Sequence, residues 1–207
     1  MKLYTYDPAP NPRRVALFNQ YKGISIDTEQ VDMMKAEQLT EEYRQINPRC
    51  TVPALQLDDG TVLTEVIGIV TYLEETHPEK PLLGTTPLQK AQVISWVHFL
   101  GHTMTLPIAH MLRNRGEAFR NRALPGPLDI PQIPEMIERG KLQLTYTLPQ
   151  LDQQLASGGW LAGDFFSFAD IDLLIGVEFM AWVKQSVPEE CTNLHNWYQR
   201  AKAELGA

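Results

Sequence analysis

The sequence of 207 residues predicts a small α/β domain followed by an all-helical domain. Over residues 1–80, short segments typical of strands alternate with segments whose apolar residues recur at helical spacing. A segment rich in proline and glycine, from His77 to Pro87, comes next. Beyond it, apolar residues recur at helical spacing through most of the chain. We therefore expect one domain at residues 1–80 and another at residues 87–207.

The first domain opens with a β-prone run at residues 2–6. Residues 7–12 contain three prolines, and we expect no regular structure there, because proline lacks an N–H and restrains the residue before it. Helical spacing from Arg13 stops at Gly23. The later elements give the order β-α-β-α-β-β-α, with a strand at 24–31, a helix at 37–45, a hairpin of strands at 52–57 and 61–64, and a helix at 66–75.

The second domain is expected to consist of helices joined by loops. The first stretch, 88–115, is amphipathic and should be interrupted or kinked at Pro107. Residues 124–134 hold four prolines and should form a loop. The remaining helices are predicted at 135–155, 166–184 and 194–205, and the second of these is nearly all apolar, as a central buried helix would be.

Composition narrows the class of protein. Eighteen Lys and Arg against 25 Asp and Glu give a net charge of −7, which disfavours nucleic acid and anionic membranes as partners. No apolar run approaches the roughly 18 residues that span a bilayer, and the first residues show no apolar signal core. The only two cysteines, Cys50 and Cys191, are far apart, so a disulfide framework is excluded. We expect a cytoplasmic protein.

The run Thr51-Val52-Pro53 enters a strand just before the hairpin. Proline cannot donate to a sheet ladder, so Pro53 belongs at the strand's start or edge, or in a cis bond. A cis bond would turn the N–H and C=O of Val52 outward, where an extended peptide could pair with them. A plain edge proline fits this piece of sequence equally well.

Glu65-Val66 lies where a strand of the hairpin meets a helix. Free N–H groups in the first turn of a helix bind carboxylates, and Glu65 could meet an ammonium group. An α-amino acid, such as one end of glutathione, carries both groups. Taken alone, Glu65 could equally be a helix cap.

In combination, these features resemble the glutathione S-transferase family. The resemblance is carried by the element order, by Asn47-Pro48-Arg49-Cys50-Thr51-Val52-Pro53-Ala54-Leu55 and by Glu65-Val66. The second half agrees through Leu194-His195-Asn196-Trp197 and the segment 160–171, in which Ser167 and Asp170 form an N-capping pair of structural role. The resemblance spans nearly the whole chain.

The resemblance implies the glutathione transferase fold, with a thioredoxin-like domain that binds glutathione and a helical domain that covers a hydrophobic second-substrate pocket. It implies that Val52, beside a cis Pro53, pairs with the cysteinyl part of glutathione. Glu65 and the N–H of Val66 would hold the γ-glutamyl end, and Gln38 the glycyl carboxylate. Cys50 and Thr51 would border the groove.

Two departures from the family pattern bear on chemistry. Many members have Glu-Ser where this chain has Glu65-Val66, so a hydroxyl bond worth about 1 kcal/mol is lost. Many also have Ser, Cys or Tyr where this chain has Ala9, whose methyl group cannot stabilise a thiolate. Asn11 is then the best donor to the sulfur, at a helix start that favours anions; the alternative is that Asn11 only caps its helix. Bacterial members such as the Nu class also have Pro-Asn without the serine and are associated with disulfide reduction.

Other polar residues carry weaker signals. Cys50 follows Arg49 but is not assigned a redox role, and the loop at 9–13 has no Cys-x-x-Cys pair. His98 and His102 share a helical face but lack converging ligands, so we expect core or pocket lining and no metal. By the resemblance, the helix at 88–115 walls the second-substrate pocket, and its candidate residues there are Thr103, Leu106, His110 and Met111.

The prediction is a glutathione transferase that uses the glutathione thiolate on an electrophile, a disulfide or a peroxide. The family resemblance implies a homodimer and a role in detoxification. The alternatives are a glutathione-fold scaffold protein without catalysis, which Ala9 and Val66 favour, and a specialised glutathione-dependent isomerase or dehalogenase. The sequence does not name the second substrate.

Overall fold

The computed structural model describes residues 1–206, and the chain divides into two compact units. The first comprises Met1–Lys80 together with the tetrapeptide Pro125–Leu128. The second comprises Pro81–Leu124 and the residues from Asp129 onward. The tetrapeptide therefore lies with residues that are far from it in sequence.

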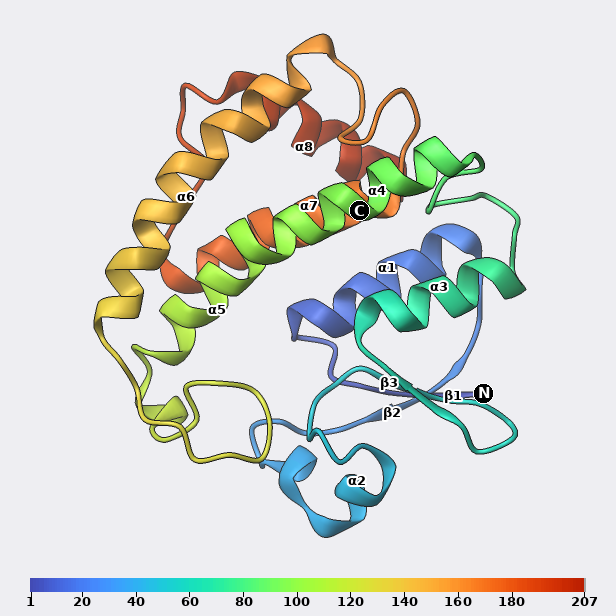
Figure 1. Cartoon of the computed structure of the whole chain (residues 1–207), viewed down its shortest axis with the longest axis vertical. Coiled ribbons are helices and arrows are strands. Elements are labelled where there is room, and N and C mark those ends of the chain that lie inside the picture. The colour runs from blue at the N-terminus through green and yellow to red at the C-terminus, as the bar shows by residue number, and fades with distance from the viewer. Residues whose placement is uncertain (207) are drawn as a thin grey trace. The chain divides into compact units, whose positions relative to one another are not determined.

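The first unit is built on a four-stranded sheet of order β2-β1-β3-β4 (Figure 1). Strand β1 (Lys2–Thr5) pairs in parallel with β2 (Asp27–Gln30) and antiparallel with β3 (Ala54–Gln56). Strand β4 (Val62–Thr64) pairs antiparallel with β3 and completes the predicted hairpin. Because side chains alternate along a strand, Leu3 and Tyr4 of β1 serve the cores on opposite faces.

Helices cover both faces of this sheet. Helix α1 (Pro10–Lys22) packs against α3 (Val66–Thr76) on one face, and α2 (Glu41–Ile46) lies on the other (Figure 1). Between the sheet and α2, the rings of Tyr4 and Tyr43 meet edge to face with centroids 6.1 Å apart. This core fixes α2 and the segment that follows it, which leads to Val52.

The expectation that regular structure is absent up to residue 12 is wrong, because α1 begins at Pro10. The first N–H groups of a helix have no partner within the helix, so Pro10 and Pro12 cost it no hydrogen bond there. The predicted end is confirmed, since Gly23 adopts the left-handed conformation with φ of 74°.

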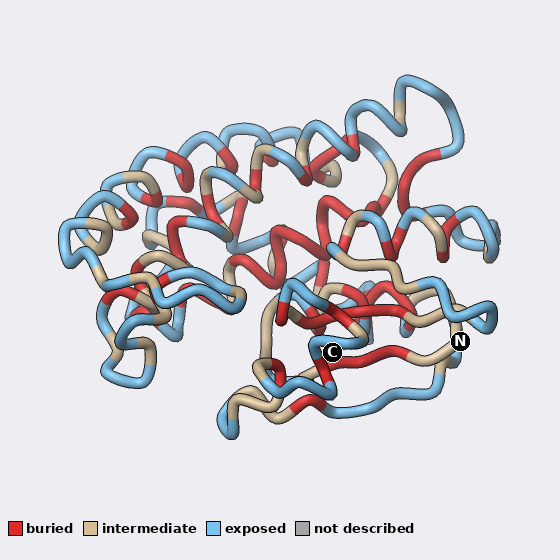
Figure 2. Tube along the Cα trace, turned by 60° about the horizontal axis from the view of Figure 1, so that its bottom comes forward, coloured by how far each residue is buried: buried red, intermediate tan, exposed pale blue. Residues whose placement is uncertain are grey.

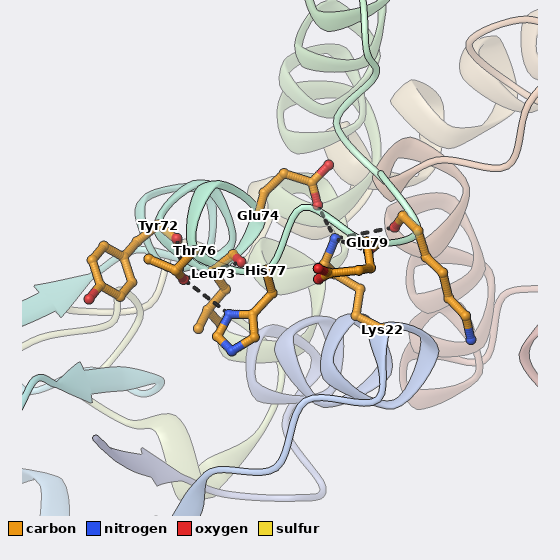
Figure 3. A network of polar contacts seen from close by, with 8 residues as sticks. Lys22, Tyr72, Leu73, Glu74, Thr76, His77 and Glu79 are labelled. Atoms are coloured by element: carbon orange, nitrogen blue, oxygen red, sulfur yellow. Dashed lines mark hydrogen bonds and ion pairs between the residues drawn. The ribbon is translucent and has the colours of Figure 1, made fainter.

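The C-terminal ends of α1 and α3 are joined by the buried ammonium group of Lys22 (Figure 3). The Lys22 Nζ donates to Glu74 Oε2 at 2.7 Å and to the carbonyl oxygens of Glu79 and Lys80 at 2.8 and 3.2 Å. The Lys22 side chain is fully buried, and a buried ammonium needs such partners. Lys22 thus fixes the chain at the end of the first unit.

The second unit is helical. The most buried element is α7 (Phe168–Met180), where nearly every residue is inaccessible, as predicted for the central helix. Figure 2 shows the buried stretches of the chain in red. The predicted capping pair is confirmed: the Ser167 N–H donates to Asp170 Oδ2 at 3.0 Å in a capping box. The α-helices of the second unit are α4 (Pro87–Leu100), α5 (Leu106–Arg113), α6 (Glu135–Gln154), α7 (Phe168–Met180) and α8 (Thr192–Leu205).

The interruption of the first long helix lies before Pro107. A π-helical segment, Gly101–Thr105, separates α4 from α5, and Pro107 falls in the first turn of α5, where proline is tolerated. None of the helices within residues 1–206 is long and apolar enough to cross a membrane.

Candidate functional site

The predicted cis bond between Val52 and Pro53 is confirmed. The preceding carbonyl, that of Thr51, is held from inside the domain by Tyr43 Oη at 2.7 Å and Asn47 Nδ2 at 2.8 Å. Burial raises the pKa of Tyr43 to about 12, so its hydroxyl remains a donor at any physiological pH. In contrast, the N–H and C=O of Val52 have no hydrogen-bond partner among the described residues. An extended peptide can pair with them.

Glu65 and the start of α3 form a second feature. Glu65 has φ of 63° and ψ of 132°, a conformation that is unusual for a residue with a side chain. The N–H groups of Val66, Ile67 and Gly68 find no acceptor in residues 1–206. Three free donors in the first turn of an eleven-residue helix suit a carboxylate, and Glu65 beside them suits an ammonium.

Glu65 has a neighbour that the sequence analysis missed. Arg49 Nη1 lies 3.3 Å from Glu65 Oε1 and donates to Thr64 Oγ1 at 3.1 Å. The two charged side chains are 63% and 70% exposed, so both are open to a ligand. Their separation of 16 positions gave no sequence signal for this pair.

Gln38 follows β2 in a short 3₁₀ turn and is only 3% exposed. Its buried Oε1 has no hydrogen-bond partner in the described part of the chain. Buried polar atoms are nearly always paired, so this acceptor is available to a donor such as a ligand N–H. An amide side chain can offer Oε1 to a ligand N–H and Nε2 to a carboxylate.

The start of α1 is poorer in donors than the start of α3. Ala9 occupies the N-cap without a side-chain bond, and Pro10 and Pro12 have no N–H. The Arg13 N–H bonds to the Ala9 carbonyl at 3.1 Å. Within the described residues 1–206, Asn11 therefore has the one unpaired backbone N–H of this first turn. The first turn of α1 therefore offers a ligand a single backbone donor, that of Asn11.

The side chain of Asn11 is exposed, and its amide oxygen accepts a hydrogen bond from Arg14. Arg14 Nη1 donates to Asn11 Oδ1 at 3.0 Å, so the Nδ2 donor points away from the guanidinium. Asn11 makes no side-chain cap to its own helix. The alternative that Asn11 only caps its own helix therefore does not match the structure. The Nδ2 donor of Asn11 remains available to an anion.

Cys50 lies in a tight bend rather than at an open surface. It has φ of 54°, is only 2% exposed, and its Sγ lies 3.7 Å from the Pro48 carbonyl oxygen. A buried thiol is a poor nucleophile. The bend also touches the tetrapeptide, since a β-carbon built on Gly126 would lie 3.5 Å from the Arg49 carbonyl oxygen.

The residues expected in a second-substrate pocket lie in the second unit and differ in exposure. Leu106 is exposed, whereas Met111 is buried and packs α5 against Gly140 of α6. Thr103 is partly buried and donates to the Phe99 carbonyl at 2.8 Å. Burial, and secondarily the charge of Arg139, lower the pKa of the half-buried His110. His110 is therefore neutral at physiological pH.

The expectation of a core position for His98 and His102 is wrong, because both side chains are exposed. Their place in the lining of a pocket stays a prediction. Their Nε2 atoms lie 2.8 Å apart, one turn apart on the helix. Within the described residues, no group of three or more His, Cys, Asp or Glu side chains is placed to hold a metal ion.

The sheet order, the helices on its two faces and the cis-proline before β3 define the first unit as a thioredoxin-like domain. Residues 9–76 match the glutathione S-transferase N-terminal domain, and residues 123–204 match the C-terminal domain of the same family. The chain belongs to the glutathione S-transferase family, and its activity is glutathione-dependent transfer.

Similar proteins cover almost the whole chain. Glutathione S-transferase 2 of Saccharomyces cerevisiae is 30% identical over 96% of this chain and 85% of its own length. A maleylacetoacetate isomerase of Pseudomonas aeruginosa is 29% identical, covering 88% of this chain and 86% of its own. The crystal structure of Gtt2 from Saccharomyces cerevisiae, 30% identical, superposes with a TM-score of 0.87 over 98% of this chain and 96% of that one.

Proposed function

We propose that glutathione lies along the first unit, from Gln38 past Val52 to Glu65 and α3. The supporting observation is that each of these three places carries unmet hydrogen-bonding groups. Gln38 Oε1 suits the glycyl amide N–H and its Nε2 suits the glycyl carboxylate. The Val52 backbone suits the cysteinyl residue, and Glu65 with the Val66 N–H suits the γ-glutamyl end. Thr51 and Pro53 shape the middle of this groove, and Ala9 borders its thiol end.

Asn11 is proposed to stabilise the glutathione thiolate. A free thiol with pKa near 8.5 is mostly protonated at neutral pH, so the enzyme gains rate by binding the anion. Asn11 offers two donors, its backbone N–H and its Nδ2, at the positive end of α1. Loss of the proton creates a thiolate that forms a bond to an electrophilic carbon, or to the sulfur of a disulfide or the oxygen of a peroxide as the leaving group departs.

The second substrate is proposed to bind in the helical unit, with Thr103, Leu106, His110 and Met111 near it. A neutral His110 suits an uncharged or apolar molecule. A second candidate activity is glutathione-dependent isomerisation, favoured by the similarity to a maleylacetoacetate isomerase. Comparing turnover of maleylacetoacetate with that of an aryl halide and a mixed disulfide of glutathione separates these activities.

We also propose a cytoplasmic homodimer with a role in detoxification, as in the family generally. Leu142 and Tyr146 lie one turn apart on α6 and are 72% and 75% exposed, and apolar surface of this kind is often covered by a partner subunit. Sedimentation equilibrium tests the assembly: a single species of 23.5 kDa would contradict it.

The first experiment is an ultraviolet difference titration of glutathione into the protein across pH, with S-methyl glutathione as the control. We expect a saturable thiolate band with a bound pKa below that of free glutathione, and binding of the control without the band. Binding with an unshifted pKa would contradict thiolate stabilisation. Failure of both ligands to bind would contradict the proposed glutathione site.

A further inference from the structure

We propose that Arg49 binds the α-carboxylate of the γ-glutamyl group and so replaces the hydroxyl that Val66 lacks. The proposal rests on the glutathione site proposed above. It adds a binding residue at the γ-glutamyl end, where the sequence offers only Glu65 and backbone N–H groups.

The position of the guanidinium is the first argument. Arg49 Nη1 contacts Thr64 Oγ1 at 3.1 Å and Glu65 Oε1 at 3.3 Å, and these two residues lead directly into α3. The ammonium and carboxylate of an α-amino acid share one carbon atom. A ligand whose ammonium contacts Glu65 therefore has its carboxylate within reach of the same guanidinium.

The donors that Arg49 keeps open are the second argument. Arginine has five N–H donors in a planar fork that matches a carboxylate. The atoms Nη2 and Nε of Arg49 donate to no residue within 1–206, and the side chain is 63% exposed. On Glu65, only Oε1 is engaged by Arg49, so Oε2 is open to the ligand's ammonium.

Charge balance is the third argument. Without Arg49, the ligand's carboxylate and ammonium would join the Glu65 carboxylate, and the group would carry one net negative charge. The carboxylates would then repel each other at short range. Arg49 makes the set neutral, with two cations and two anions.

The backbone of Arg49 is fixed on both sides. Its N–H donates to Asn47 Oδ1 at 3.1 Å, and Cys50 after it is buried in the bend. Gly126 of the tetrapeptide approaches its carbonyl oxygen, with φ of 113°, which favours glycine. A backbone that is already held loses little conformational entropy of its own when a ligand binds to the side chain.

The test compares two ligands across variants by isothermal titration calorimetry. The ligands are S-methyl glutathione and S-methyl-γ-aminobutyryl-cysteinyl-glycine, which keeps the amine but has no α-carboxylate. We expect Arg49→Met to weaken S-methyl glutathione about tenfold, as loss of a charge-assisted hydrogen bond does, and to change binding of the second ligand less than about twofold. Arg44→Met, at an exposed arginine of α2, is the control and should change neither.

A rescue variant sharpens the test. Val66→Thr keeps the shape of the side chain and adds a hydroxyl, so it should recover several-fold of the affinity lost in Arg49→Met. Equal weakening for both ligands in Arg49→Met would overturn the proposal, because the loss would not involve the carboxylate. Tighter binding in Arg49→Met would also overturn it, by showing that Arg49 competes with the ligand's ammonium. If the wild type binds neither ligand, the proposed glutathione site fails.

Discussion

Helices α1 and α3 lie on the same face of the sheet, yet their N-termini are unlike. In the first turn of α3, three N–H groups beside Glu65 and Arg49 have no acceptor among the residues that the structure describes. The first turn of α1 offers one, because Pro10 and Pro12 have none and Ala9 adds no polar side chain. The γ-glutamyl end is therefore built for binding, and the thiol end depends on a single residue, Asn11. Affinity and reactivity should respond to different mutations.

Glu65→Gln should have the largest effect, at the α3 end. It removes the charge that meets the ligand's ammonium, so we expect glutathione affinity to fall about 10- to 100-fold. Because Glu65 is exposed, the melting temperature should change little. Calorimetry measures the affinity, with Glu42→Gln on α2 as the charge-matched control. An unchanged affinity would show that Glu65 is not a ligand residue.

Asn11→Ala acts at the α1 end and should separate reactivity from binding. Loss of Nδ2 should raise the pKa of the bound thiol by about one unit, equivalent to roughly 1.4 kcal/mol. Below that pKa, kcat should fall about tenfold, and the pH–rate profile should move toward higher pH by the same unit, with a similar KM for glutathione. If KM rises while the thiol pKa stays constant, Asn11 has a positioning role in binding instead.

Ala9→Ser should move reactivity in the opposite direction. Because residue 12 is proline, a serine at the N-cap could accept a cap bond only from the N–H of Asn11. Its own O–H would remain a donor to the sulfur in either case. We expect the bound thiol pKa to fall by about half a unit to one unit, from one added hydrogen bond. The difference titration detects this directly, and an unchanged spectrum across pH would place Ala9 away from the sulfur.

Pro10→Ala should have the smallest effect. It restores one backbone N–H to α1, and a helix-terminal donor is worth only about 0.3–1 kcal/mol to an anion. The thiol pKa should fall by a few tenths of a unit, and Pro8→Ala, outside the helix and exposed, serves as the control. A rise in pKa would indicate that the proline itself orients Asn11.

Much of the framework follows from local sequence. Three features were predicted correctly: the β3–β4 hairpin, the end of α1 at Gly23 and the Ser167–Asp170 capping pair. Each depends only on residues that are close together in the sequence. For Pro53 the local sequence left a cis bond and an edge position open, and it was the family resemblance that implied the cis bond, which is confirmed. Local signals are sufficient where the interaction is itself local.

Contacts between distant residues were not predictable in this way. The pairing of Arg49 with Glu65 and the placement of residues 125–128 in the first unit depend on how the chain folds back. The start of α1 at Pro10 was missed for another reason. The same proline that ends a helix interior is tolerated in its first turn, so residue type alone does not decide.

The burial of both cysteines affects how readily the protein itself is oxidised. Cys50 and Cys191 are each 2% exposed, and burial raises the pKa of the Cys191 thiol. Neither offers an accessible thiolate to glutathione disulfide or hydrogen peroxide, so mixed disulfides and sulfenic acids should form slowly on the protein itself. The cysteines of an enzyme that binds glutathione are thereby protected from forming mixed disulfides with it.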